Sequence, residues 1–112
     1  MTIRRLALCA AALSLVAGAA HAADPQNGRK LFMEHICYSC HGTAGAGGGA
    51  AGPKIAPGPL PLAAFTRQLR HPNRMPPYTD KLISDAEVAD IHAYLSSVPA
   101  AKSPSQIPLL SK

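Results

Sequence analysis

The sequence predicts an all-α domain with one small core, and three observations support this fold class. Segments 24–36, 62–70 and 84–98 carry apolar residues at the three- and four-residue spacing of an amphipathic helix. No segment shows the two-residue alternation of a half-buried strand. The stretch 42–61 is too rich in glycine and proline for regular structure. We therefore expect three main helices joined by long loops.

The first helix is expected to begin at Asp24-Pro25, an N-cap followed by proline at the first helical position. It should run straight into residues 37–41. Gly28 lowers its helix propensity by about 1 kcal/mol relative to alanine, so another backbone or ring is expected to pack close to this glycine. The apolar stripe of this helix consists of Phe32, Met33 and Ile36.

The other two helices have clear limits. One enters through Pro61 and is stopped by His71-Pro72, with an apolar face of Leu62, Phe65 and Leu69. The last begins with the capping-box pair Ser84 and Glu87 and ends at Pro99. Its apolar stripe consists of Val88, Ile91, Tyr94, Leu95 and Val98.

The first 22 residues have the pattern of a secretory signal. Arg4 and Arg5 precede an apolar run over 6–20, and Ala20-His21-Ala22 offers small residues at the two positions that a signal peptidase reads. An uncleaved membrane anchor is the alternative, but the run is shorter than the ~20 residues that cross a bilayer. Cys9 lies too early in the run for lipid attachment. We expect cleavage near Ala22, export to the periplasm and no membrane span afterwards.

Removal of 22 of the 112 residues leaves 90, which is one small domain at most. We expect the domain over 23–99 and an extended tail over 100–112, with Ile107, Leu109 and Leu110 as candidate contacts to the body. The chain has two Phe, three Tyr and no Trp. A core so poor in aromatic residues needs a further component to fill its centre.

Residues 37–41 read Cys-Tyr-Ser-Cys-His, a motif that three kinds of site could use. A structural zinc site needs four ligands, usually in two spaced pairs, and the remaining candidates are His35, His71 and His92. A thiol–disulfide enzyme places Cys-x-x-Cys between a strand and a helix, whereas this pair follows a helix.

Covalent haem attachment uses every feature of the motif. Two thiols one helical turn apart can each add to a vinyl group of the porphyrin, and the next residue places an imidazole beneath the iron. We therefore expect one haem c bound through Cys37 and Cys40, with His41 as the proximal ligand. The ring would also supply the missing apolar core.

Met75 is the candidate for the second axial position. It precedes Pro76-Pro77, whose fixed φ angles make a stiff loop that could hold a weak thioether ligand in place. A single methionine more often fills core space, and His71 is the second candidate ligand. The remaining candidates are expected to be packing or boundary residues, namely Met33, His35 and His92.

Taken together, these residues resemble a class I c-type cytochrome over nearly all of the sequence after residue 22. The matching residues are Cys37, Cys40, His41, Gly52-Pro53, Met75, Gly28, Phe32 and Tyr94. The resemblance implies a small cytochrome c fold in which Gly28 and Phe32 meet Tyr94. It also implies that the Pro53 carbonyl accepts a hydrogen bond from His41, that Pro53 and Ile55 belong to the cofactor site, and that the glycine-rich loop wraps the haem.

The resemblance further implies a function. His/Met ligation leaves no open position on the iron, so the expected role is one-electron transfer rather than catalysis. The stretch 74–95 is similar to cytochromes that accept electrons from periplasmic dehydrogenases or oxidases. We expect the protein to pass these electrons on to a respiratory acceptor. The alternatives are a haem enzyme or gas sensor with a displaceable distal ligand, and a cytochrome subunit of one dehydrogenase complex.

The charge distribution suggests the kind of partner. The formal net charge is +5, of which Arg4 and Arg5 in the expected signal segment contribute two, and the excess of the remaining chain lies between residues 42 and 83. Basic and aromatic residues do not interleave, which argues against nucleic acid, so we expect redox partner proteins with an acidic docking face. A merely solvated basic surface is the alternative. The chain departs from the family in its Gly/Ala-rich loop and lack of Trp, and the candidate propionate partners are Arg67, Arg70, Arg74 and Tyr78.

Overall fold

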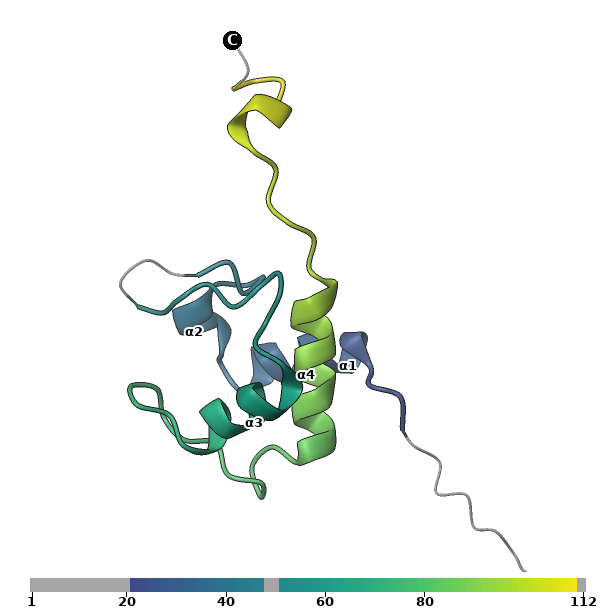
Figure 1. The fold of residues 1–112 in the computed structure, drawn as a ribbon, viewed down its shortest axis with the longest axis vertical. Helices are drawn as coiled ribbons and strands as arrows, with labels where there is room; N and C mark the ends of the chain where they lie inside the picture. Colours follow the sequence, from purple (N-terminus) through teal and green to yellow (C-terminus); the bar gives the residue numbers. More distant parts are fainter. Residues whose placement is uncertain (1–20, 48–50, 111–112) are drawn as a thin grey trace, which may run out of the picture.

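The structure is a computed structural model that describes residues 21–47 and 51–110 of the chain. The described residues form α1 (Pro25–Glu34), α2 (Tyr38–His41), α3 (Leu62–Arg70), α4 (Asp85–Ser97) and a 3-10 helix, η1 (Pro104–Gln106), and include no strand (Figure 1). The all-α prediction is therefore confirmed, with α1, α3 and α4 as its main helices. Except for residues 21 and 22, the expected signal segment, including Cys9, lies outside the described residues.

Helices α1 and α4 cross in close contact at Gly28. The glycine is buried, and a Cβ atom at this position would lie 2.9 Å from the backbone nitrogen of Ile91 and would overlap the Asp90 carbonyl group. Beside this contact, the ring centroids of Phe32 and Tyr94 are 5.6 Å apart. The expected crossing of the first and last helices is confirmed, with Phe32 against Tyr94. Gly28 itself meets the backbone of Asp90 and Ile91 and not the Tyr94 ring.

Local capping explains where the helices begin. Asp24 stands directly before Pro25, the first residue of α1. Its carboxylate accepts hydrogen bonds from the backbone N–H groups of Gln26 and Asn27. At the start of α4, the Ser84 N–H donates to Glu87 Oε2 at 2.8 Å and the Glu87 N–H donates to Ser84 Oγ at 3.3 Å. This is the reciprocal capping box that the sequence predicted.

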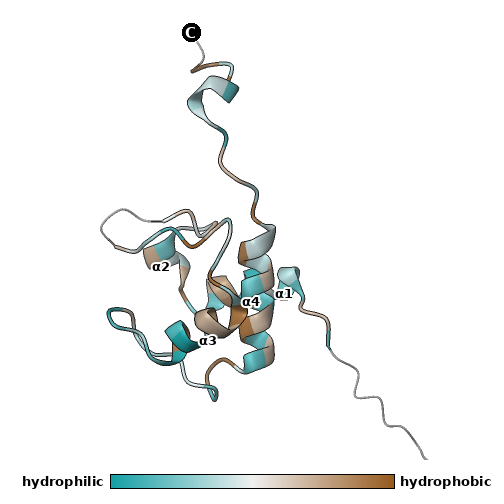
Figure 2. Cartoon of the chain, viewed as in Figure 1, coloured by the Kyte–Doolittle hydropathy of each residue, from teal (hydrophilic) through white to brown (hydrophobic). Residues whose placement is uncertain are grey.

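The buried core lies among α1, α3 and α4, and Figure 2 shows hydrophobic colour where α3 faces α4. The predicted apolar face of α4 is confirmed, since Val88, Ile91, Tyr94 and Leu95 are all buried. In α3, Phe65 and Leu69 are buried while Leu62, in the first turn, stays exposed. The buried core consists of Leu31, Phe32, Ala56, Phe65, Leu69, Ile83, Val88, Ile91, Tyr94 and Leu95.

Asp90 is the one charged side chain among the buried described residues, at 4% exposure. Its carboxylate accepts from the Asp24 N–H at 2.7 Å and from Asn27 Nδ2 at 2.8 Å. The Asn27 amide and the Asp24 backbone N–H stabilise the ionised form and hold the pKa of Asp90 below its usual range. Asp90 therefore fastens the start of α1 to the middle of α4.

The first helix does not run straight into residues 37–41, so that part of the prediction is wrong. α1 ends at Glu34, and Ile36 adopts φ +60°, a left-handed conformation that is unfavourable for a β-branched residue. The contact at Gly28 sets the buried face of α1, which consists of Gly28, Leu31 and Phe32. Met33 lies off this face and Ile36 lies after the end of the helix, and both are exposed.

The C-terminal segment leads away from the helices in Figure 1. Leu109 is 84% exposed and Leu110 is 62% exposed, so these two residues do not make the expected contacts with the body. Ile107 is half-buried, and its N–H donates to the Pro104 carbonyl within the tail itself. Across residues 21–47 and 51–110, no helix combines the length and the apolar composition that membrane crossing requires.

Candidate functional site

The two cysteines of the motif lie one turn apart at the short helix α2. The His41 N–H donates to the Cys37 carbonyl at 3.1 Å, which closes this turn. Both thiols are free, with Cys37 half-buried and Cys40 exposed. Burial raises the pKa of the Cys37 thiol, which disfavours the thiolate that disulfide exchange requires. Within the described part of the chain, no three His, Cys, Asp or Glu side chains gather as a metal-binding group.

The imidazole of His41 is oriented by the loop that follows it. Its Nδ1 atom lies 2.8 Å from the Pro53 carbonyl oxygen, the contact that the resemblance implies. A carbonyl can only accept, so Nδ1 carries a hydrogen, and Nε2 is the nitrogen available to bind a metal. A neutral ring held by one nitrogen is the usual arrangement of a histidine that binds a metal through the other nitrogen.

The glycine-rich loop reaches His41 because Gly52 permits a close approach to α2. A Cβ atom on Gly52 would lie 2.6 Å from the Cys40 carbonyl oxygen, so a larger residue would push the loop away. Further along, the Ile55 and Ala56 N–H groups both donate to the Gly45 carbonyl, at 2.8 and 2.9 Å. The loop is thereby folded onto α2, with Pro53 facing His41 and Ile55 half-buried against the core.

The predicted distal residue, Met75, lies in the non-helical segment between α3 and α4. It is half-buried and packs against the same core as Cys37 and Ile55. The loop after α3 and the short helix α2 both lie on the α3 side of α4 in Figure 1. The structure thus brings the motif, the Pro53 loop and Met75 to one core.

The other candidate ligands have different surroundings. His71 is exposed at the end of α3. His92 Nε2 lies 2.8 Å from the Leu60 carbonyl oxygen, and its ring meets Phe65 edge-on at 5.5 Å. The His35 ring lies against Tyr78, with 6.3 Å between centroids. These contacts fit the boundary roles expected for His35 and His92.

Two candidate propionate partners already have protein partners. The Arg70 guanidinium donates to Asp85 and to the Tyr78 carbonyl, and the Tyr78 hydroxyl donates to the His35 carbonyl. The sequence did not predict these hydrogen bonds of Arg70 and Tyr78, because each of them joins residues from different elements. Arg67 and Arg74 are exposed.

Two free thiols one turn apart, an oriented imidazole and a half-buried thioether form a donor set that fits a covalently held haem. On a small helical scaffold, this combination defines the class of c-type cytochromes.

Comparison with known proteins agrees. Residues 23–95 match the family described as cytochrome C oxidase, cbb3-type, subunit III, and the chain belongs to this family. It is also 37% identical over 87 residues to a cytochrome bc1 complex cytochrome c subunit of Corynebacterium diphtheriae. That match covers 75% of this chain but 30% of the relative, so the chain spans less than a third of the relative's length. No solved structure matches the chain. Membership of this family implies haem c binding and a role in haem-based electron transfer.

Proposed function

We propose that the chain is a one-electron carrier with a single haem c, covalently attached through Cys37 and Cys40 and ligated by His41 and Met75. The observation that carries this proposal is the 2.8 Å contact between His41 Nδ1 and the Pro53 carbonyl oxygen, because it leaves Nε2 free to bind iron. The free thiols, one turn apart, support attachment at the same place.

When bound, the haem supplies the Fe(II)/Fe(III) couple. His41 and Met75 would hold its iron, and the protein's part is to keep these two side chains in place. Pro53 holds the imidazole in one orientation, and Pro76-Pro77 limits the motion of the segment that carries Met75. Met75 contributes a neutral thioether, which favours the ferrous form. With His41 and Met75 both bound, the iron would have no place for a substrate, and electron transfer is the chemistry that would remain.

The redox partners are proposed from the names of the related proteins and from the exposed basic residues of the chain. The family and the relative are both named after respiratory complexes, which supports a respiratory acceptor. A periplasmic dehydrogenase or oxidase remains the proposed donor. The exposed basic residues of the middle segment would face an acidic docking surface, namely Lys54, Arg67, Arg74 and Lys81. The chain would reach these partners in the periplasm after cleavage near Ala22, with no membrane span.

Spectra and ligand binding test this proposal. Haem should remain with the denatured polypeptide at one per chain, and the oxidised protein should show the absorption of a thioether–iron bond. Carbon monoxide should bind poorly to the reduced protein at neutral pH. Met75→Ala should lose the absorption band and bind carbon monoxide readily, because the position is then open. Met33→Ala, which removes an exposed methionine, is the matched control and should behave like the native protein.

Ready binding of carbon monoxide by the native protein would instead support the haem enzyme or gas sensor. The same titration therefore separates the two classes of function.

A further inference from the structure

The segment that carries Met75 has no helix of its own, and hydrogen bonds join its residue Tyr78 to α3. The Tyr78 N–H donates to the Leu69 carbonyl at 2.9 Å. The Tyr78 carbonyl accepts from Arg70 Nη1, also at 2.9 Å. Both backbone hydrogen-bonding groups of Tyr78, three residues after Met75, are thus held by the end of α3.

The side chain of Tyr78 also connects the Met75 segment to the residues just before the Cys37–His41 motif. Its hydroxyl donates to the His35 carbonyl at 3.2 Å, and its ring meets the His35 ring edge-on. His35 directly follows α1 and stands two residues before Cys37. One tyrosine therefore connects the segment of the proposed distal ligand with the segment of the proximal ligand.

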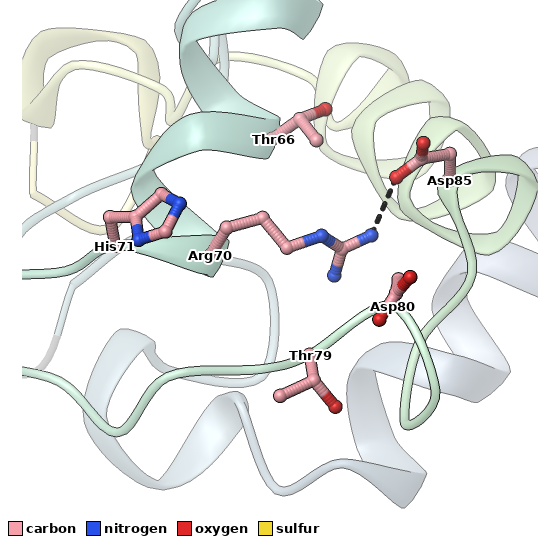
Figure 3. Close-up of a pocket in the computed structure, with 6 residues that line it drawn as sticks. All are labelled: Thr66, Arg70, His71, Thr79, Asp80 and Asp85. Atoms are coloured by element: carbon pink, nitrogen blue, oxygen red, sulfur yellow. Dashed lines mark hydrogen bonds and ion pairs between the residues drawn. The ribbon is translucent and has the colours of Figure 1, made fainter.

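Arg70 also contacts α4. Its Nη2 atom donates to Asp85 Oδ1 at 2.6 Å, as Figure 3 shows, beside a cavity of about 460 Å³. The Arg70 side chain is 15% exposed, whereas that of Asp85 is 80% exposed. Solvent screens a pair with one such exposed member, so the Asp85 contact should matter less than the contact with the Tyr78 carbonyl.

We infer that Arg70 and Tyr78 are positioning residues that keep the Met75 thioether on the haem iron. These two side chains, with the His35 and Tyr78 carbonyls that they bind, are called the clasp below. The inference rests on the proposed function, in which Met75 is the distal ligand. A thioether is a weak ligand, so the time it spends off the iron depends on the mobility of its segment. The clasp limits that mobility by tying the segment to α3 and to the end of α1.

The test is titration of the oxidised, haem-loaded full chain with imidazole, an added ligand that binds where Met75 has left. Its apparent affinity rises with the population of the open state. Arg70→Gln removes a charge-assisted hydrogen bond and should tighten imidazole binding by roughly tenfold or more. Tyr78→Phe removes a neutral hydrogen bond and should tighten it by roughly fivefold.

Three variants act as controls. Asp85→Asn keeps the Arg70 contact with Tyr78 and should change the affinity less than about twofold. Lys30→Gln removes one positive charge from an exposed ion pair with Glu34 and should have no effect. In a Met75→Ala background, Arg70→Gln should also have no effect, because no thioether remains to be displaced. A purely structural role of Arg70 would change imidazole binding in both backgrounds.

The outcomes separate the two proposals. If Met75→Ala binds imidazole no more tightly than the native protein, Met75 is not the distal ligand and the proposed function fails. If Met75→Ala binds much more tightly but both clasp variants match the native protein, the ligand stands and the clasp is refuted. An effect of Asp85→Asn equal to that of Arg70→Gln would also refute the clasp, because the ion pair would then explain the result. Should Arg70→Gln fail to fold, Tyr78→Phe provides the same test.

Discussion

Substitution of Gly28 by alanine should destabilise the protein by forcing α1 and α4 apart. The added Cβ would overlap the Asp90 carbonyl and lie 2.9 Å from the Ile91 nitrogen, and neither backbone atom can rotate away. Non-bonded heavy atoms prefer about 3.5–4.0 Å, so the helices must separate by about 1 Å or more. That separation loosens the packing of Phe32, which is 1% exposed, against Tyr94.

The expected magnitude follows from two opposing effects. Overpacking costs about 1–3 kcal/mol, and a clash with rigid backbone belongs at the upper end of that range. Alanine regains about 1 kcal/mol in helix propensity. The net loss is therefore about 2 kcal/mol, or roughly 8–16 °C in melting temperature for a domain of this size.

Guanidinium unfolding of the haem-loaded protein, followed by far-UV circular dichroism, measures this loss. The midpoint should fall without a change in slope, since the surface exposed on unfolding stays the same. Gln26→Ala is the matched control, because it places alanine on the exposed face of the same helix and should stay within about 0.5 kcal/mol of the native protein. If Gly28→Ala is as stable as Gln26→Ala, the close contact between α1 and α4 does not require glycine at position 28.

Two further predictions concern charge. Hydrogen bonds from Asn27 and the Asp24 N–H lower the pKa of Asp90 in the folded protein. The ionised Asp90 carboxylate therefore stabilises the fold above the unfolded pKa of about 4, and this stabilisation is lost as pH falls through the lower pKa of the folded state. Asp90→Asn should therefore be less stable at neutral pH and lose less stability between about pH 4 and pH 2 in thermal melts; equal losses would contradict this account of Asp90. Electron transfer to an acidic partner should slow as ionic strength rises, because salt screens the basic surface. A stopped-flow rate that does not depend on salt would remove the docking role of that surface.

Much of the helical structure could be predicted because its causes are local. The Ser84–Glu87 capping box joins residues three positions apart, and the apolar stripe of α4 follows from its own spacing. The limits of α3, at Leu62 and Arg70, agree with the prediction. They could be predicted because Pro61 stands directly before the helix and Pro72 follows soon after its end. The chemistry of the site was predictable for the same reason, since Cys37, Cys40 and His41 stand together in the sequence.

Errors and omissions occurred where distant residues decide the outcome. The apolar stripe predicted for the first helix included Met33 and Ile36. Met33 lies off the face that Gly28 packs against α4, and Ile36 lies beyond the end of α1 at Glu34, so both are exposed. The sequence led to no prediction about Asp90. Asp90 is buried, because partners 63 and 66 residues earlier in the chain satisfy its carboxylate.

The sequence by itself determined where the main helices begin, where α3 and α4 end, and which contiguous side chains could hold a haem. The tertiary structure alone decided which face of α1 is buried and what Arg70 and Tyr78 bind. The physical reason is the range of the interactions. Helix caps and a five-residue motif depend on neighbours within about one turn. The Tyr78 contact with His35 joins residues 43 positions apart, and only the packing of the helices brings them together.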